Sequence, residues 1–136
     1  EINFRDINPI IWENSFKDYR INHVAAIDPG FVWGLEASDL SELVKSVTLI
    51  GLGNGTDRLM DTDFDSSGLA SYIPDAQVLR LVPATHFTAM PLCTPSGEDI
   101  LKDEKDDPVC TDPAGTDRHI AHQRIIDLLA DQVGLP

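Results

Sequence analysis

An aspartate and a histidine at the ends of two β-rich segments are the residues best suited to chemistry in this sequence. Residues 47–57 form a short apolar run that breaks into small residues and ends in Asp57, and residues 79–86 do the same and end in His86. Groups just past the carboxyl ends of neighbouring parallel strands meet in one crevice. An acid and a histidine that meet there form a general base with its orienting carboxylate; the alternative for His86 is a purely structural histidine.

Such a pair normally activates a nucleophile, and none is evident in this sequence. In nucleophilic catalysis such a histidine takes a proton from a serine or cysteine. The chain offers no convincing candidate for that role. The sequence therefore predicts an acid–base pair without its nucleophile.

The composition excludes several classes of partner. The chain has 136 residues, enough for one domain with a real core, and a formal net charge of −13. Phosphate recognition needs a basic patch, so we expect neither nucleic acid nor an anionic membrane surface as partner. No apolar run approaches the roughly 20 residues that span a bilayer. Because the chain opens at Glu1 without an initiator methionine, we expect a processed chain or a piece of a longer one.

Alternating strands and helices must position the acid and the base. The pattern predicts helices that start near Asn8, Ser38 and Asp65, each followed by a strand: residues 23–27, 47–52 and 77–82, respectively. A last helix is predicted over residues 117–133. This alternation indicates an α/β fold of three layers, with helices flanking a parallel sheet. The first strand is too apolar for a free edge, so we expect an interior strand whose neighbour is absent.

One aromatic pattern bears on the core. Trp12, Phe16 and Tyr19 follow the helix start Asn8-Pro9 at the spacing i, i+4, i+7. This spacing predicts an amphipathic helix whose aromatic side packs on the core.

The two cysteines, Cys93 and Cys110, lie in the polar segment over residues 83–116. A pair that brackets a long loop is typical of a disulfide, which is worth about 3 kcal/mol, and the spacing matches no common metal site. We expect a disulfide and hence a periplasmic or secreted protein. The alternative is two reduced thiols in a cytoplasmic protein.

Two groups of side chains suggest metal binding and are set aside. The carboxylates of residues 57–65 partly match a calcium loop, but glycine is missing from its sixth position and Tyr72 stands where the bidentate glutamate belongs. His119 and His122 lie three residues apart on the last predicted helix, with no third ligand of matching spacing. We therefore expect no metal and no cofactor.

Three segments together resemble the C-terminal half of an α/β-hydrolase. They are residues 24–30 (Val-Ala-Ala-Ile-Asp-Pro-Gly), 49–57 (Leu-Ile-Gly-Leu-Gly-Asn-Gly-Thr-Asp) and 83–87 (Pro-Ala-Thr-His-Phe). With residues 91–93, residues 107–113 and the helix that follows, the chain more closely resembles predicted dienelactone hydrolases related to platelet-activating-factor acetylhydrolase. The likeness runs from about Asn22 onward, and the order and spacing of the motifs carry it.

The resemblance implies a partial domain. The three strands would be the last of the hydrolase sheet, and residues 1–136 would form a single partial domain without the nucleophile-bearing half. In that fold the triad runs serine, acid, histidine along the chain, and the serine belongs to a Gly-x-Ser-x-Gly turn upstream of this sequence. Ser66 and Ser96 lack the preceding strand and glycine, so both are rejected as nucleophiles.

The resemblance also implies the roles of the site residues. His86 would be the base, and Asp57, at the usual α/β-hydrolase position, is the favoured acid. Asp28, one strand earlier, matches the position that the acetylhydrolase relatives use, although an aspartate before Pro-Gly can simply start a turn. The expected activity is serine-dependent hydrolysis of a small-molecule carboxylic ester or lactone.

Two partners fit this interpretation: the N-terminal half of the same hydrolase, or a second copy of the chain. The isolated chain is expected to show no triad-dependent turnover. The rival interpretation is a non-catalytic interaction module that dimerises through the strand over residues 23–27.

Overall fold

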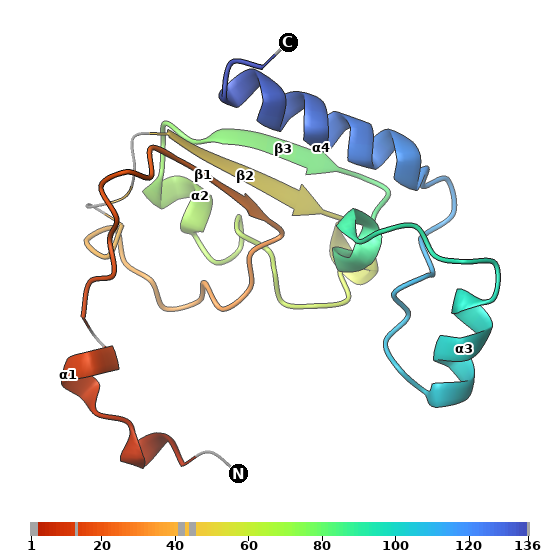
Figure 1. Cartoon of the computed structure of the whole chain (residues 1–136), viewed down its shortest axis with the longest axis horizontal. Coiled ribbons are helices and arrows are strands. Elements are labelled where there is room, and N and C mark those ends of the chain that lie inside the picture. The colour runs from red at the N-terminus through yellow and green to blue at the C-terminus, as the bar shows by residue number, and fades with distance from the viewer. Residues whose placement is uncertain (1–2, 13, 41–42, 44–45, 136) are drawn as a thin grey trace.

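A sheet of three parallel strands lies at the centre of the computed structural model, which describes residues 3–12, 14–40, 43 and 46–135 (Figure 1). The strands, in spatial order, are β1 (His23–Ile27), β2 (Ser46–Leu52) and β3 (Gln77–Leu81). The register pairs Ala25 with Thr48 and Ile50 with Leu79. The predicted mixed α/β architecture with an all-parallel sheet is confirmed.

Helices and short 3₁₀ turns connect and flank these strands. In chain order the described elements are η1 (Phe4–Asp6), α1 (Pro9–Trp12), η2 (Gly55–Asp57), α2 (Leu69–Tyr72), η3 (His86–Ala89), α3 (Gly97–Glu104) and α4 (Arg118–Gln132). The last helix agrees with its prediction, and the Asp117 side chain caps it by accepting a hydrogen bond from the backbone N–H of Ile120 at 3.1 Å. The segment after β3, which was expected to be a loop, contains α3.

The central strand β2 is buried on both faces, so successive side chains enter two separate clusters. One cluster lies under α4 and contains Ile50, Leu52, Leu81, Ala84, Ala121 and Ile125. The other lies on the opposite face, toward α2, and contains Val32, Val47, Leu49, Phe64 and Leu69. Figure 1 shows α4 running along one side of the sheet and α2 on the other.

β1 is an edge strand in the part of the chain that the structure describes. Four of its five residues are exposed, and the side chains of Val24 and Ile27 are 38% and 40% accessible. The N–H of Ser46 donates to the Asn22 carbonyl and the N–H of Asp28 donates to the Ile50 carbonyl, so the backbone groups of the even-numbered residues point toward β2. The backbone groups of the odd-numbered residues therefore point away from the sheet, as on any edge strand.

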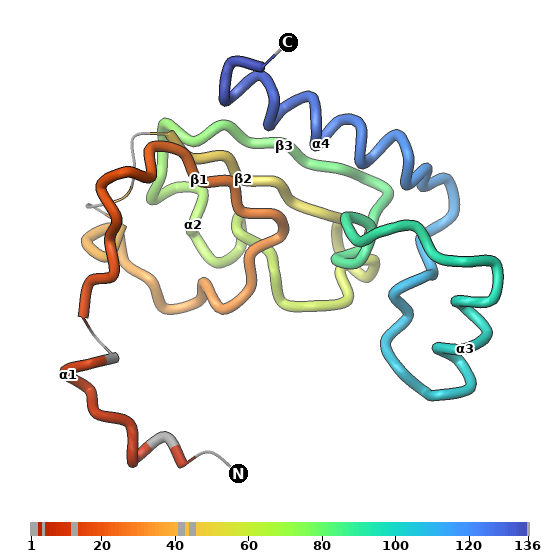
Figure 2. Tube along the Cα trace, in the orientation of Figure 1, coloured from red at the N-terminus to blue at the C-terminus, as the bar shows by residue number. Residues whose placement is uncertain are grey.

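The predicted aromatic helix is wrong beyond its first turn. α1 ends at Trp12, and Phe16 and Tyr19 lie outside any helix with 78% and 83% of their surface exposed. Figure 2 shows this N-terminal segment leading away from the sheet. Helices in proteins are stabilised mainly by packing of their apolar face, and the exposed side chains of Phe16 and Tyr19 lack such packing. The helix predicted from Ser38 is a turn as far as residue 40, and the rest of it lies mostly outside the described residues.

The segment after β3 forms a lobe around α3, closed by the predicted disulfide. Cys93 and Cys110 are bonded, with their Cα atoms 5.8 Å apart. Gly97 packs against this bridge, because a Cβ there would lie 3.1 Å from the Cys110 sulfur. A bonded cysteine pair is consistent with an oxidising compartment.

Among the described residues, no helix has the length and apolar character that crossing a membrane requires.

Candidate active site

Asp28 and His86 lie at the same end of the sheet, and their side chains are hydrogen-bonded. Asp28 directly follows β1, and His86 begins η3, shortly after β3. The imidazole Nδ1 is 2.7 Å from the Asp28 Oδ2. Because an ionised carboxylate only accepts hydrogen bonds, Nδ1 is the donor in this bond, and in a neutral ring the lone pair is then on Nε2. This is the arrangement of a general base with its orienting carboxylate.

A sharp turn after β1 places Asp28. Its φ of 47° lies in the left-handed region, which aspartate adopts more readily than most residues. Its backbone N–H still donates to the Ile50 carbonyl at 2.6 Å, so the turn begins while the strand is still paired. The carboxylate is thereby held against the end of β2.

The Asp28 carboxylate is fully buried and saturated with donors. Its side chain has 0% exposure. Oδ1 accepts from the Leu52 N–H at 2.9 Å and from the Arg58 Nη1 at 3.1 Å. Oδ2 accepts from the Thr62 hydroxyl at 2.7 Å and from His86. A buried charge is tolerated only when it is paired and hydrogen-bonded, and this carboxylate meets both conditions.

Arg58 is the cationic partner of Asp28 and is itself fixed. Its side chain is 14% exposed, and Nη2 donates to the Gly53 carbonyl at 2.9 Å. Gly53 has a φ of 75°, and a Cβ there would lie 2.3 Å from the Ala84 carbonyl oxygen. The loop that carries Arg58 therefore abuts the loop that carries His86.

The turn that carries His86 is stabilised by its own side chains. The Thr85 hydroxyl accepts from the Phe87 N–H at 3.2 Å, and the Thr88 hydroxyl accepts from the Thr85 N–H at 2.8 Å. These reciprocal bonds form a capping box around the first residues of η3. The backbone at His86 is thus held on both sides.

A second polar cluster ties this turn to the disulfide-closed lobe and to α4. The Thr88 hydroxyl donates to Asp112 at 2.7 Å, and Arg118 donates to both oxygens of the same carboxylate at 2.8 and 3.0 Å. Burial raises the pKa of Asp112, but the hydrogen bonds from Arg118 and Thr88 together outweigh it, so the pKa lies below its ordinary 3.8. Asp112 therefore stays ionised and holds η3 in place.

His86 opens onto a pocket of about 530 Å³ with an apolar wall. The His86 side chain is 29% exposed and is part of the pocket lining. Phe31, Trp33 and Met60 line the pocket and are all exposed in the free chain. Asp61 adds a negative charge to the same lining. Such a site suits an uncharged, apolar ligand.

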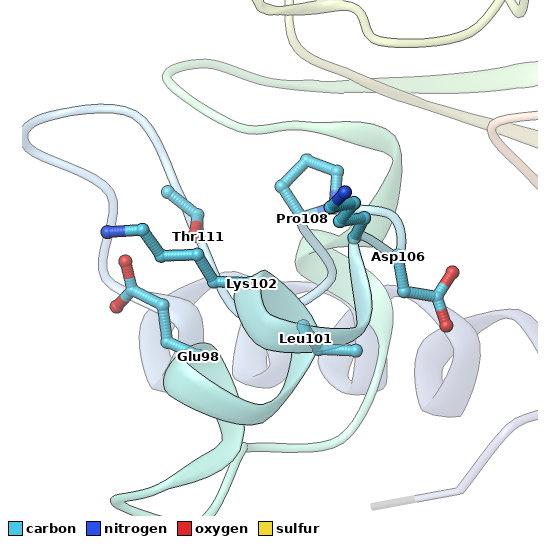
Figure 3. A pocket seen from close by; sticks show the side chains of 7 residues that line it. Glu98, Leu101, Lys102, Asp106, Pro108 and Thr111 are labelled. Atoms are coloured by element: carbon cyan, nitrogen blue, oxygen red, sulfur yellow. The ribbon is translucent and has the colours of Figure 1, made fainter.

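Another pocket, of about 430 Å³, lies beside α3 and lacks this chemistry (Figure 3). Glu98, Leu101 and Lys102 of α3 line one side, and Pro108 and Thr111 lie across from them. The lining mixes opposite charges and contains no histidine. The pocket next to His86 is therefore the better candidate for an active site.

The structure does not join Asp57 to the histidine. Asp57 ends the turn η2, and its N–H donates to the Asn54 carbonyl at 3.1 Å. Within the described part of the chain, its carboxylate forms no hydrogen bond or ion pair with His86. The acid in contact with the base is Asp28, the alternative in the sequence analysis, rather than the favoured Asp57.

The two rejected serines lie away from the imidazole's contacts. The Ser66 hydroxyl donates to Asp63 at 2.8 Å, and Ser96 precedes α3 in the disulfide-closed lobe. No hydroxyl or thiol among the described residues is hydrogen-bonded to His86. In the part of the chain that the structure describes, His86 and Asp28 are therefore in contact with each other but with no nucleophile.

The side chains considered for metal binding have other contacts. Asp65 forms an ion pair with Arg80, and His122 Nε2 lies 2.8 Å from the Thr88 carbonyl. His119 is exposed on α4. Across the described ranges, no three histidine, cysteine, aspartate or glutamate side chains gather into a group that could hold a metal ion.

Sequence reasoning missed Arg58 and Thr62 as members of the site. A usable signal existed, because both residues follow the small-residue loop after the second predicted strand. A carboxylate buried at that edge needs a counter-charge, and the chain has only 10 lysines and arginines against 23 acidic residues. An arginine in that loop was therefore a candidate partner.

Comparison of the chain with models of protein families, with curated proteins and with solved structures finds no match. The function is therefore inferred from the geometry of the site.

Proposed function

We propose that this chain supplies the acid and the base of a serine hydrolase that cleaves carboxylic esters or lactones. Asp28 is the acid and His86 is the base. The observation that carries the proposal is the 2.7 Å hydrogen bond between them, which leaves the other imidazole nitrogen available at the pocket. The parallel strand order, and a histidine that follows the last strand with its acid earlier in the chain, agree with the C-terminal part of a three-layer α/β-hydrolase.

In the proposed reaction the His86 Nε2 accepts the proton of a serine hydroxyl as its oxygen attacks the ester carbonyl. The bond to the leaving alcohol then breaks, and the same proton passes from Nε2 to that alcohol. A water molecule then attacks the acyl-serine and gives a proton to Nε2, which passes it to the serine oxygen as the carboxylic acid product leaves. Asp28 keeps the hydrogen on Nδ1 and stabilises the imidazolium that forms in each half.

The nucleophile in this proposal comes with a strand that pairs with β1. Among the described residues, the outward backbone groups of the odd-numbered β1 positions have no hydrogen-bond partner, and such an open edge can pair with another strand. A parallel strand added there would end beside Asp28, so a serine just past its end would lie close to His86. The proposed partner is the other half of the same hydrolase, as a separate segment or a separate chain.

The pocket supports an uncharged substrate with an apolar group. Phe31, Trp33 and Met60 offer apolar surface next to His86. Asp61 and the net charge of −13 disfavour anionic substrates. Short neutral esters and lactones are therefore the substrates to test first.

The isolated chain allows a direct test, because a diffusible nucleophile can replace the serine. With p-nitrophenyl acetate and methanol, we expect His86 to speed acetyl transfer to methanol and water without a burst. His86→Ala should abolish the acceleration and Asp28→Asn should reduce it. His119→Ala, which removes an exposed histidine on α4, should leave it unchanged.

Two results would overturn the proposal in this form. Equal rates for the unmodified chain and His86→Ala would show that His86 is not a functional base. A burst of p-nitrophenol that His86→Ala abolishes would show a nucleophile within the chain itself.

A second candidate function is a dimerisation module that uses β1. The exposed apolar side chains of Val24 and Ile27 on an open strand edge favour it. Two copies related by a two-fold axis would pair their β1 edges antiparallel. A dimer in sedimentation equilibrium, combined with no His86-dependent rate, would favour this function, and a monomer would exclude it.

A further inference from the structure

We propose that Arg58 is a positioning residue of this site. Its guanidinium supplies a fixed positive charge to Asp28, and this leaves His86 neutral with Nε2 free to accept a proton. The inference rests on the proposed function, since it assigns Arg58 to the same acid–base pair.

Asp28 has two basic partners, Arg58 and His86. A carboxylate with 0% exposure needs a positive partner, and Arg58 lies 3.1 Å from Oδ1 while His86 lies 2.7 Å from Oδ2. No other basic side chain among the described residues pairs with Asp28. An arginine keeps its charge at all ordinary pH values, whereas the histidine changes its charge during the proposed reaction. Arg58 is therefore the partner present in every step.

Hydrogen bonds hold the Arg58 guanidinium in place. Nη2 donates to the Gly53 carbonyl, and Nη1 reaches the Thr62 hydroxyl at 3.3 Å as well as Asp28. Gly53 in turn lies against Ala84, two residues before His86. The guanidinium thus occupies a fixed place behind the carboxylate, on the opposite oxygen from the imidazole.

The charge balance at Asp28 determines the charge on the His86 ring. Without Arg58, Asp28 would have His86 as its remaining basic partner, and the attraction between a carboxylate and an imidazolium is strong where water is excluded. The doubly protonated ring would be favoured, and its Nε2 could no longer accept a proton. Asp61, which lines the same pocket, would add to this effect. Behind the turn, His122 and Asp112 both contact Thr88, and the charge of Asp112 is paired with Arg118.

The ¹⁵N NMR signals of the His86 ring, recorded at one fixed neutral pH, test this role without any assay of activity. Arg58→Met should raise the ratio of imidazolium to neutral imidazole by about tenfold or more, the change that a lost neighbouring charge produces. Arg58→Lys should restore the neutral ring because it restores the charge. Arg124→Met, a matched change at an exposed position of α4, should leave the signals unchanged.

A folded Arg58→Met chain with unchanged His86 signals would overturn the inference. If that variant does not fold, Arg58→Lys decides, since an imidazolium signal there would show that charge at this position is not what keeps the ring neutral. The proposed function fails separately. The ring signals could respond as expected while His86→Ala leaves the ester reaction unchanged. That result would support the role of Arg58 and exclude the hydrolase function.

Discussion

Gly53 and Ala84 touch where the loops after β2 and β3 cross. A Cβ at position 53 would lie 2.3 Å from the Ala84 carbonyl oxygen, and the Gly53 N–H donates to the Leu81 carbonyl at 2.9 Å. One loop carries Arg58 and the other carries His86, so this contact fixes how closely those two loops approach each other. It also needs glycine, because the φ of 75° is strained for other residues.

Gly53→Ala should therefore destabilise the chain and move His86. We expect a loss of about 2 kcal/mol or more in the free energy of unfolding, from the clash added to the backbone strain. Gly34→Ala is the matched control, since Gly34 also has a positive φ, of 86°, but no atom within 4 Å of the added Cβ. It should cost about 1 kcal/mol from strain alone. Urea unfolding measures both, and equal losses would contradict the contact.

Asp28→Asn and Asp57→Asn should separate the two candidate acids. Asp28→Asn leaves Arg58 buried without its partner, so we expect a loss of about 3 kcal/mol in stability. An amide can also donate to the imidazole, which would move the ring hydrogen from Nδ1 to Nε2 and stop Nε2 from acting as a base. Asp57→Asn should change neither property. Thermal unfolding and the ring ¹⁵N signals give the two readouts, and an effect of Asp57→Asn alone would reverse the assignment.

Asp112 should make stability depend on pH in the acid range. Its pKa is lowered in the folded chain, since the bonds from Arg118 and Thr88 outweigh burial. The stabilisation is therefore fully present above the ordinary value of 3.8 and is lost as the pH falls through the lower folded-state pKa. Asp112→Asn should be less stable than the unmodified chain well above pH 3.8, and the difference should shrink below it. A difference that stays constant over this range would contradict the prediction.

Removal of the disulfide should loosen the lobe around α3. The bridge joins residues separated by 17 positions, and closure of a loop of that length is worth about 3 kcal/mol. Cys93→Ser with Cys110→Ser should lower the unfolding free energy by about that amount. Intact mass of the unmodified chain, lighter by its two thiol hydrogens, checks that the bond forms. A chain with two free thiols after aerobic purification would contradict the bridge.

Proline substitutions in β1 should test the open strand edge. The backbone N–H of Ala25 points outward, whereas that of Ala26 points toward β2. Ala25→Pro should therefore leave the chain folded but prevent a partner strand from pairing there. Ala26→Pro should break the existing ladder and destabilise the sheet. Circular dichroism and sedimentation of the partner complex, or of the dimer, measure the two effects, and an unchanged complex with Ala25→Pro would exclude β1 as the interface.

Much of the fold was available from local patterns. The apolar runs at 23–27, 47–52 and 77–82 predicted the three strands, and the alternation with helices predicted their parallel order. The bonded pair Cys93 and Cys110 agrees with the expectation for a bracketed loop. Periodicity failed for Phe16 and Tyr19, because a regular spacing does not supply the surface on which an aromatic stripe must pack.

The sequence by itself determined that an acid and a histidine would follow strands of one parallel sheet, since apolar runs and turn residues are properties of neighbouring positions. Only the tertiary structure decided which acid meets His86. The left-handed turn at Asp28 keeps that carboxylate at the end of β2, while η2 places Asp57 at the end of a separate turn. The pair joins residues 58 positions apart, with Arg58 from a third segment between them in the chain. Contacts between residues so far apart in the sequence depend on how the loops pack together, and local sequence patterns do not predict that packing.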